Sequence, residues 1–288
     1  MAYHPRVRSS RKKAILFILF TFAAVGMAYS PLRTLLRTTA HFEYYSHIVL
    51  IPLVSAFFLF WKRKEIFVGL EPLFPPGLLV MASGLALFLW GRGRLTGLDD
   101  AASIAAFAAL VFWAGAFLFT FGPAVLRKAS FPVAFLLFAV PLPAVVMETI
   151  ISALVTASVA VTGFLFKVVG VHFTREGSVF RLPGFSLEVA RECSGIRSSL
   201  SLLVVGVLAG HLFLRKFWKK PLLAISVFPI AVFKNGLRIV SLYLLSYYID
   251  MRFIEGDFHH KFAGAVFFVF GLLMLALVLW LLRRREKD

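Results

Sequence analysis

The sequence predicts an all-α polytopic membrane protein, a bundle of about eight transmembrane helices with a small extracytoplasmic cap resembling a β-hairpin. Hydrophobic residues make up 60% of the 288 positions, and the mean hydropathy is +0.87. Several apolar runs reach the roughly 17 to 25 residues that cross a bilayer core. Such segments must be helices, because a spanning segment has to satisfy its own backbone polar groups. This composition excludes a water-soluble domain.

The basic residues support the same fold class. The formal net charge of +17 suggests nucleic-acid binding at first. The Lys and Arg residues, however, gather between the apolar runs, at residues 6–13, 62–64, 127–128, 215–220 and 283–287. This is the positive-inside pattern of membrane proteins. We therefore expect a multi-pass protein of the plasma (inner) membrane that contacts membrane lipids and no nucleic acid.

The basic clusters assign the first four crossings. The run at 14–29 follows five basic residues and lacks a small-residue cleavage site, so we interpret it as a retained helix rather than a signal peptide. With the N-terminus in the cytoplasm, residues 46–61 return to the second basic cluster. Residues 77–90 form a short third crossing, and residues 101–121 return to the third cluster.

The next apolar run allows two topologies. Residues 130–170 are interrupted by Pro141 and Pro143, which should break or kink a helix because proline lacks the amide donor. Two crossings there would place Cys193 in the cytoplasm. One crossing, with residues 144–169 forming an interfacial or re-entrant helix, would place Cys193 outside.

The downstream clusters favour the external position of Cys193. Residues 196–214 end at the basic cluster 215–220, so the cysteine end of that helix lies on the opposite side. Residues 222–240 then run outward, which puts Arg238 near the outer end of that helix. Residues 261–282 run back to the last basic cluster.

The segment before the cysteine does not look helical. Residues 171–189 contain short, partly alternating runs separated by glycine turns at Gly177 and Gly184, which predicts two or three small strands. We expect these strands to cap the membrane face that carries Cys193. The predicted organisation is one transmembrane domain, residues 1–288, with a strand-containing insertion at 171–190.

In this topology, we expect three chemically capable side chains to reach the external face from three different helices. Cys193 is the only cysteine, and a helix N-terminus and nearby cations would favour its reactive thiolate. His260 is suited to proton transfer near neutral pH. Arg238 stays protonated, so it suits stabilisation of an oxyanion or orientation of a carboxylate.

Other residues could support this site. Asn235 precedes Arg238 by three positions and shares its helical face, so it could hold the guanidinium or contact substrate. Ser194 and Arg197 flank the cysteine, and His259 neighbours His260.

Structural roles are the alternatives. A lone membrane cysteine often only packs, and an arginine near a helix end often extends toward the interface. A metal site formed by Cys193, His172, His259 and His260 is conceivable, but its ligand spacing matches no known pattern. We therefore expect neither metal nor cofactor.

The order of these motifs resembles the exosortase and archaeosortase family: Cys193-Ser-Gly, then Asn235-Gly-Leu-Arg-Ile, then His260 followed four residues later by Gly264. The resemblance implies a membrane cysteine protease or transpeptidase. It would cleave the C-terminal sorting signal of secreted proteins, composed of a short motif such as Pro-Glu-Pro, a hydrophobic helix and a basic tail.

In this family pattern Cys193 is the nucleophile that forms a thioester, Arg238 the catalytic arginine and His260 the third member. Transfer of the substrate to a lipid or glycan acceptor would make the enzyme a transpeptidase. The chain departs from the pattern at Glu192, where many members have a small residue.

Two functions of other classes compete with the enzyme. A transporter or flippase-like protein could bind an anionic lipid-linked sugar through Arg238 and His260. A non-catalytic assembly factor for envelope polysaccharide could use the same fold. Neither needs the thiol of Cys193, which separates both from the enzyme.

Overall fold

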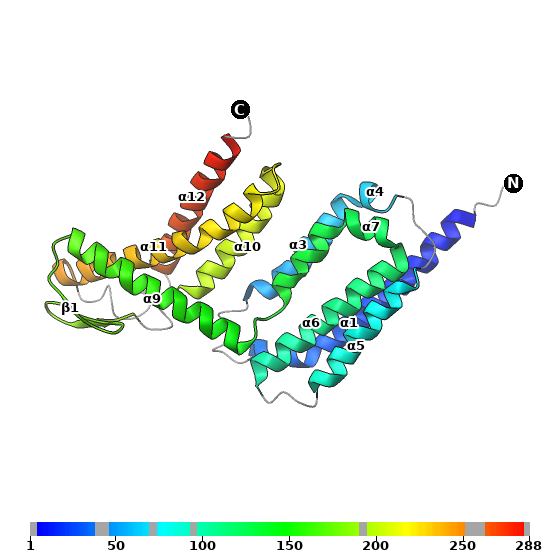
Figure 1. Cartoon of the computed structure of the whole chain (residues 1–288), viewed down its shortest axis with the longest axis horizontal. Coiled ribbons are helices and arrows are strands. Elements are labelled where there is room, and N and C mark those ends of the chain that lie inside the picture. The colour runs from blue at the N-terminus through cyan, green and yellow to red at the C-terminus, as the bar shows by residue number, and fades with distance from the viewer. Residues whose placement is uncertain are drawn as a thin grey trace. The chain divides into compact units, whose positions relative to one another are not determined.

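The computed structural model describes residues 5–37, 46–68, 74–92, 97–189, 195–250 and 263–284. These residues are mostly helical and form two compact units, Met1–Val146 and Met147–Asp288 (Figure 1). The single transmembrane domain stays a prediction, because one membrane domain can contain two such units.

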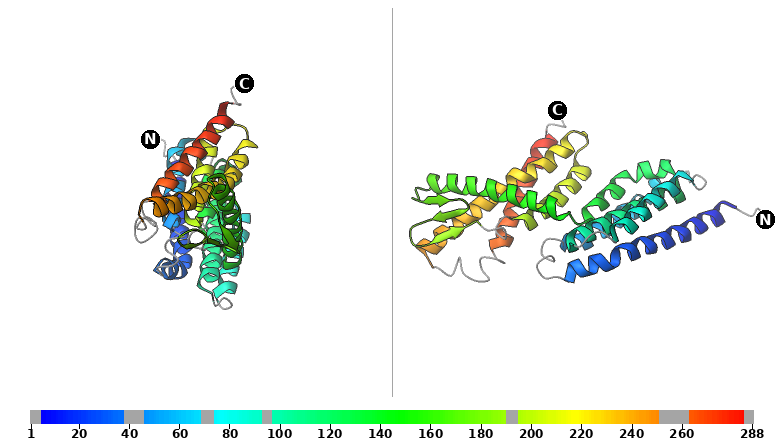
Figure 2. Two further views of the ribbon diagram at one scale, coloured as in Figure 1. Left: turned by 90° about the vertical axis from the view of Figure 1, so that its left-hand side faces the viewer. Right: turned by 60° about the horizontal axis from the view of Figure 1, so that its bottom comes forward.

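The first unit is built on three long helices. Helix α6 packs against both α1 and α5, and the three run side by side in Figures 1 and 2. Helix α1 extends beyond the predicted run at 14–29 at both ends. The elements of this unit are α1 (Pro5–Arg37), η1 (Ser46–Val49), α3 (Leu50–Trp61), α4 (Arg63–Ile66), α5 (Pro76–Arg92), α6 (Leu98–Phe121), α7 (Pro123–Lys128), α8 (Ser130–Phe135) and η2 (Leu136–Ala139).

Glycines allow α5 and α6 to approach at backbone distance. A Cβ added at Gly84 would lie 2.5 Å from the backbone nitrogen of Phe112, and one at Gly115 would lie 2.5 Å from that of Met81. In a bilayer, helices associate largely through such close packing of small residues. These glycines therefore set the distance between α5 and α6.

Gly84→Ala is expected to destabilise the protein by about 1 to 3 kcal/mol, because the new methyl group overlaps backbone that cannot move aside. Thermal unfolding of the purified protein in detergent measures the change. Gly26→Ala on α1 is the matched control, because a Cβ there meets nothing within 4 Å. An unchanged melting temperature for Gly84→Ala would contradict this prediction, because it would show that α5 and α6 can move apart without loss of stability.

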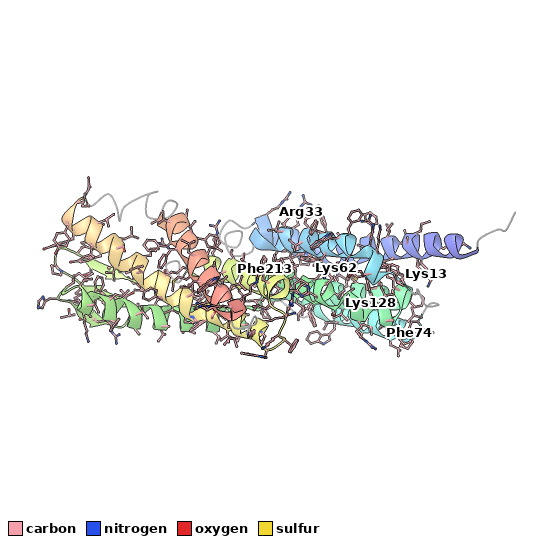
Figure 3. All side chains as sticks on the ribbon, turned by 90° about the horizontal axis from the view of Figure 1, so that it is seen from above. Lys13, Arg33, Lys62, Phe74, Lys128 and Phe213 are labelled. Carbon is pink, nitrogen blue, oxygen red and sulfur yellow. The ribbon has the colours of Figure 1, made fainter. Side chains whose placement is uncertain are left out.

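The basic turns of the first unit share one end. Ile66, two residues beyond the 62–64 cluster, packs in one core cluster with Phe121 and Val125, which lead to the 127–128 cluster. Lys62 and Lys128 mark these turns in Figure 3. This common end is what the positive-inside pattern requires.

Helix α9 (Ala144–Val168) begins at the opposite end of the unit. The backbone amide of Ala144 donates a hydrogen bond of 2.9 Å to Oδ1 of Asp100, in the first turn of α6. The predicted break at Pro141 and Pro143 is confirmed, because η2 ends at Ala139 and α9 starts at Ala144. Helix α9 is also long enough to cross a membrane.

The second unit contains a helical bundle and a small sheet. Helix α11 packs against α10 and α12, which also contact each other. Its elements after α9 are β1 (Thr174–Glu176), β2 (Val179–Arg181), β3 (Ser186–Glu188), α10 (Ile196–Phe213), α11 (Lys219–Tyr248) and α12 (Ala263–Arg284).

The two or three small strands predicted for residues 171–189 are confirmed; we call this sheet the strand cap. The three strands form an antiparallel sheet in the order β1-β2-β3, with Phe180 at its centre paired to Arg175 and Leu187. Phe180 is fully buried and contacts the ring of Phe166 on α9 at 5.5 Å between centroids. The Tyr243 hydroxyl of α11 donates to the Pro183 carbonyl at 3.3 Å. The cap therefore packs on the last turns of α9 and α11.

The second unit also gathers its basic residues at one end. Lys219 Nζ donates a 2.7 Å hydrogen bond to the carbonyl of Leu282, beside the final basic cluster. The guanidinium of Arg283 lies 6.0 Å from the ring centre of Phe213. The end of α10, the start of α11 and the end of α12 therefore lie together, as the predicted topology requires.

The membrane fold is confirmed. Within the described part of the chain, six helices are long and apolar enough to cross a membrane. Three shorter apolar helices are Leu50–Trp61, Pro76–Arg92 and Ser130–Ala139. This set is consistent with a bundle of roughly eight membrane helices. The main difference is α11, which continues eight residues beyond the predicted end at position 240.

Candidate functional site

The structure describes three of the predicted site residues, Asn235, Arg238 and Arg197. The other four, Cys193, Ser194, His259 and His260, lie outside the described residues. Their predicted roles therefore remain predictions. The surroundings of the cysteine helix can still be built from Gly195 onward.

Gly195 forms the start of α10, the helix that follows Cys193 in the sequence and is called the cysteine helix below. It is the N-cap of α10 and has φ +70°, a left-handed conformation that glycine adopts without strain. Its carbonyl accepts hydrogen bonds from the hydroxyls of Ser198 at 2.9 Å and Ser199 at 2.8 Å. These local hydrogen bonds stabilise the first turn of α10. Gly195, its N-cap, follows Cys193 by two residues in the sequence.

Asn235 joins this turn to two other helices. A Cβ added at Gly195 would lie 3.4 Å from Oδ1 of Asn235, so the amide lies directly against the turn. Asn235 is only 1% exposed, and its Nδ2 donates to Ser158 Oγ on α9 at 3.1 Å. The Asn-Gly-Leu-Arg motif of α11 therefore meets the beginning of the cysteine helix.

Gly236 brings α9 and α11 into close contact beside Asn235. A Cβ there would lie 2.8 Å from Val161 Cγ1 and 3.4 Å from the backbone nitrogen of Thr162. The glycine lets α9 approach far enough for Ser158 to bond the amide. The glycine in the motif thus has a packing role that its sequence position alone did not reveal.

Lys234 is the residue that the sequence interpretation missed. It is 4% exposed, and its Nζ donates a hydrogen bond to Ser198 Oγ in the first turn of α10. Its methylene stem lies against α12, since a Cβ at Gly271 would be 3.0 Å from Lys234 Cδ. The signal was available: an ionisable side chain within an apolar helix is costly and usually has a function.

Arg238 lies one turn beyond Lys234 on the same side of α11 and is half-buried. The expectation that it sits near the end of its helix is wrong, because α11 continues to Tyr248. The additional residues pack beneath the strand cap, where Tyr243 contacts Phe166 at 5.3 Å between ring centroids. Packing against the strand cap therefore stabilises the additional turns of α11.

The length of α11 between Lys219 and Arg238 gives the distance of Arg238 from the basic end of the unit. At 1.5 Å per residue, the helical rise from Lys219 to Arg238 is about 28 Å, close to the ~30 Å thickness of a bilayer core. Asn235 and Lys234 lie about one turn closer to Lys219 along α11. Arg197, by contrast, is exposed at the start of α10. The site therefore lies about one bilayer thickness from the basic end of the unit.

Among the described residues, no group of three or more His, Cys, Asp or Glu side chains could hold a metal ion. Cys193, His259 and His260 are not among them. The arrangement that the structure does show is a meeting point of α9, α10, α11 and α12, rich in positive charge and small polar groups.

A family model described as transmembrane exosortase matches residues 37–277 of the chain. The match includes every predicted site residue. Neither the curated proteins nor the solved structures contain a match.

Proposed function

The chain belongs to the transmembrane exosortase family, and from this membership we propose that it is a cysteine protease or transpeptidase that cleaves C-terminal sorting signals. Membership supports a membrane-embedded, sortase-like processing enzyme. The substrates we propose are secreted proteins that end in a short motif, a hydrophobic helix and a basic tail. A lipid or glycan amine is the proposed acceptor when the product is transferred rather than released.

The observation that carries this proposal is the contact between Asn235 and Gly195. It brings the Asn-Gly-Leu-Arg motif of α11 against the turn that follows Cys193. Lys234 adds a second link between the same elements through Ser198. A packing cysteine would need no such convergence of polar groups from several helices inside an apolar bundle.

The proposed reaction proceeds through a thioester. The thiolate of Cys193 attacks the scissile carbonyl, and the guanidinium of Arg238 stabilises the negative charge that develops on the carbonyl oxygen. His260 gives a proton to the leaving amine as the carbon–nitrogen bond breaks. Attack by water then releases a carboxylic acid, whereas attack by an amine forms a new amide. Either second step regenerates the thiol.

The membrane depth of the site fits this substrate. A sorting signal with a hydrophobic helix and a basic tail would lie in the bilayer with its tail in the cytoplasm. Its short motif would then reach the outer boundary of the bilayer core. The helical rise of about 28 Å from Lys219 to Arg238, close to the thickness of a bilayer core, supports this arrangement. We therefore propose an active site near the extracytoplasmic face.

Co-expression with a secreted reporter tests the proposed function. The reporter carries the complete tripartite signal, and its mass is measured after recovery from the membrane and the medium. We expect cleavage at the motif only when the enzyme is present. The matched control replaces the motif and keeps the hydrophobic helix and the basic tail. Equal cleavage of both reporters, or cleavage of neither in a panel of signals, would contradict the proposal.

A further inference from the structure

We propose that a groove between α9 and the strand cap binds a phospholipid with a net negative headgroup, whose phosphate contacts Lys167 and Arg175. The groove has a volume of about 380 Å³, within the range of small-molecule sites. The other lining residues are Ala160, Gly163 and Phe164 of α9, and Phe173, which precedes β1. This binding site goes beyond the proposed function and does not depend on the proposed reaction.

The α9 side of the groove is a single stripe of the helix. Ala160, Gly163, Phe164 and Lys167 follow one another at intervals of three, one and three residues, so they share one helical face. Phe164 is 64% exposed and lies about one turn before Lys167. The stripe is therefore apolar along α9 and cationic at its last turn. A ligand that covers the whole stripe must be amphipathic.

The register of the sheet directs Arg175 toward the same groove. Arg175 pairs with Phe180, and directly opposite residues of an antiparallel pair lie on the same face of a sheet. Phe180 is fully buried and contacts the ring of Phe166 on α9. The side chain of Arg175 therefore lies on the face of the strand cap that packs on α9, where it lines the groove.

The acidic residues of the strand cap lie on its other face. Glu176 and Glu188 both pair with Val179, whose side chain points away from the face that carries Phe180. Glu176 also forms an ion pair with Arg181 at 2.8 Å. Neither glutamate therefore neutralises the groove.

Lys167 and Arg175 are available to an anionic ligand. Both are exposed, and within the described part of the chain no hydrogen bond or ion pair engages either side chain. Asp250, after the end of α11, does not line the groove. Glu192 lies outside the described residues. The guanidinium offers paired donors to phosphate oxygens, and the ammonium adds a second positive charge. A zwitterionic headgroup is disfavoured because its own cation is repelled by both side chains.

The position of the groove favours a lipid over a soluble anion. Helix α9 is long and apolar enough to cross a membrane, and Lys167 lies in its last turn. Tyr243 of α11 contacts Phe166, the neighbour of Lys167. The exposed Tyr247 and Tyr248 follow about one turn later, at the same end of the unit. Basic and tyrosine side chains at the end of an apolar helix are typical of the polar boundary of a bilayer, where lipid phosphates lie.

Lipid retention by the purified full chain tests the proposal. The protein is delipidated in detergent and mixed with equal amounts of phosphatidylglycerol and phosphatidylcholine that carry the same acyl chains. Native mass spectrometry measures the lipid that stays bound. We expect wild type to retain phosphatidylglycerol in preference to phosphatidylcholine. Lys167→Gln and Arg175→Gln should each lower this retention by about fivefold.

Arg181→Gln is the matched control, because it removes a cation from the opposite face of the same strand cap. It should leave retention unchanged. Ala160→Phe places a ring in the apolar part of the groove and keeps both cations, so it should lower retention through steric exclusion. All these positions are exposed, and unfolding temperatures without lipid should stay close to wild type.

Equal retention of the two lipids by wild type would overturn the proposal, whatever the variants show. Release of the lipid by millimolar inorganic phosphate would also overturn it, because the cations would then form a site for a soluble anion. Competition by a sorting-signal peptide that depends on both cations would assign the groove to substrate instead. Lipid retention requires no catalysis, so its failure is distinguishable from failure of the proposed function, which the reporter measures separately.

Discussion

Cys193→Ala is expected to abolish formation of a covalent adduct between the enzyme and a sorting-signal peptide, and to lower processing at least about a thousandfold. The reason is chemical: the chain contains no second thiol to replace Cys193. Intact-mass measurement of the purified enzyme after incubation with peptide detects the thioester. Addition of amines to the trapped adduct then distinguishes hydrolysis from transfer.

A displaced thiol is the control for this experiment. The double variant Cys193→Ala with Ser201→Cys keeps one thiol on the same chain but moves it eight residues along the sequence, into α10. It is expected to react with alkylating reagents and to remain inactive on peptide. Full processing by Cys193→Ala with a verified substrate would reject thiol catalysis. It would favour a transporter or an assembly factor instead.

Much of the fold could be predicted because the bilayer constrains it so strongly. Apolar runs long enough to span a membrane can only be helices. The basic clusters between them indicate which helix ends lie on the same side of the membrane. The hydrogen bond from Lys219 to Leu282 confirms that two such clusters share one end. The strands were predictable from Gly177 and Gly184, which both adopt positive φ.

The extent of α11 could not be predicted by the same argument. Residues 241–248 include Ser241, Ser246 and two exposed tyrosines, so hydropathy alone favours an earlier end. What continues the helix is tertiary packing: Tyr243 is buried against Phe166 of α9 and bonds the carbonyl of Pro183 in the cap. Such contacts join segments about 60 to 80 residues apart, which local sequence patterns do not encode.

The candidate site likewise has one feature that the sequence could predict and one that it could not. The pairing of the cysteine helix with the Asn-Gly-Leu-Arg motif was predictable from the order of motifs, and the structure places Asn235 against Gly195. The role of Lys234 was not, because it depends on Ser198 and Gly271 from two other helices. A charged residue in an apolar helix signals a function, but only its neighbours indicate which one.

Arg238→Lys is expected to reduce kcat for peptide processing by about a hundredfold to a thousandfold, with a smaller change in KM. Lysine keeps the positive charge but loses the planar fork of donors that matches two oxygen positions. The conservative change therefore separates charge from geometry. Steady-state kinetics on a fluorogenic signal peptide measure both constants, and adduct formation should slow in proportion to kcat.

The control for Arg238→Lys is Arg181→Lys in the strand cap. Arg181 pairs with Glu176 at 2.8 Å, but both side chains are more than half exposed, so the substitution should change processing little. A rise in KM alone for Arg238→Lys would mean that the guanidinium orients substrate without stabilising the oxyanion. A wild-type kcat and KM would remove Arg238 from the mechanism. The oxyanion role follows only if kcat falls while alkylation of Cys193 keeps its wild-type pH midpoint, because then the nucleophile is intact and the transition state has lost its donor.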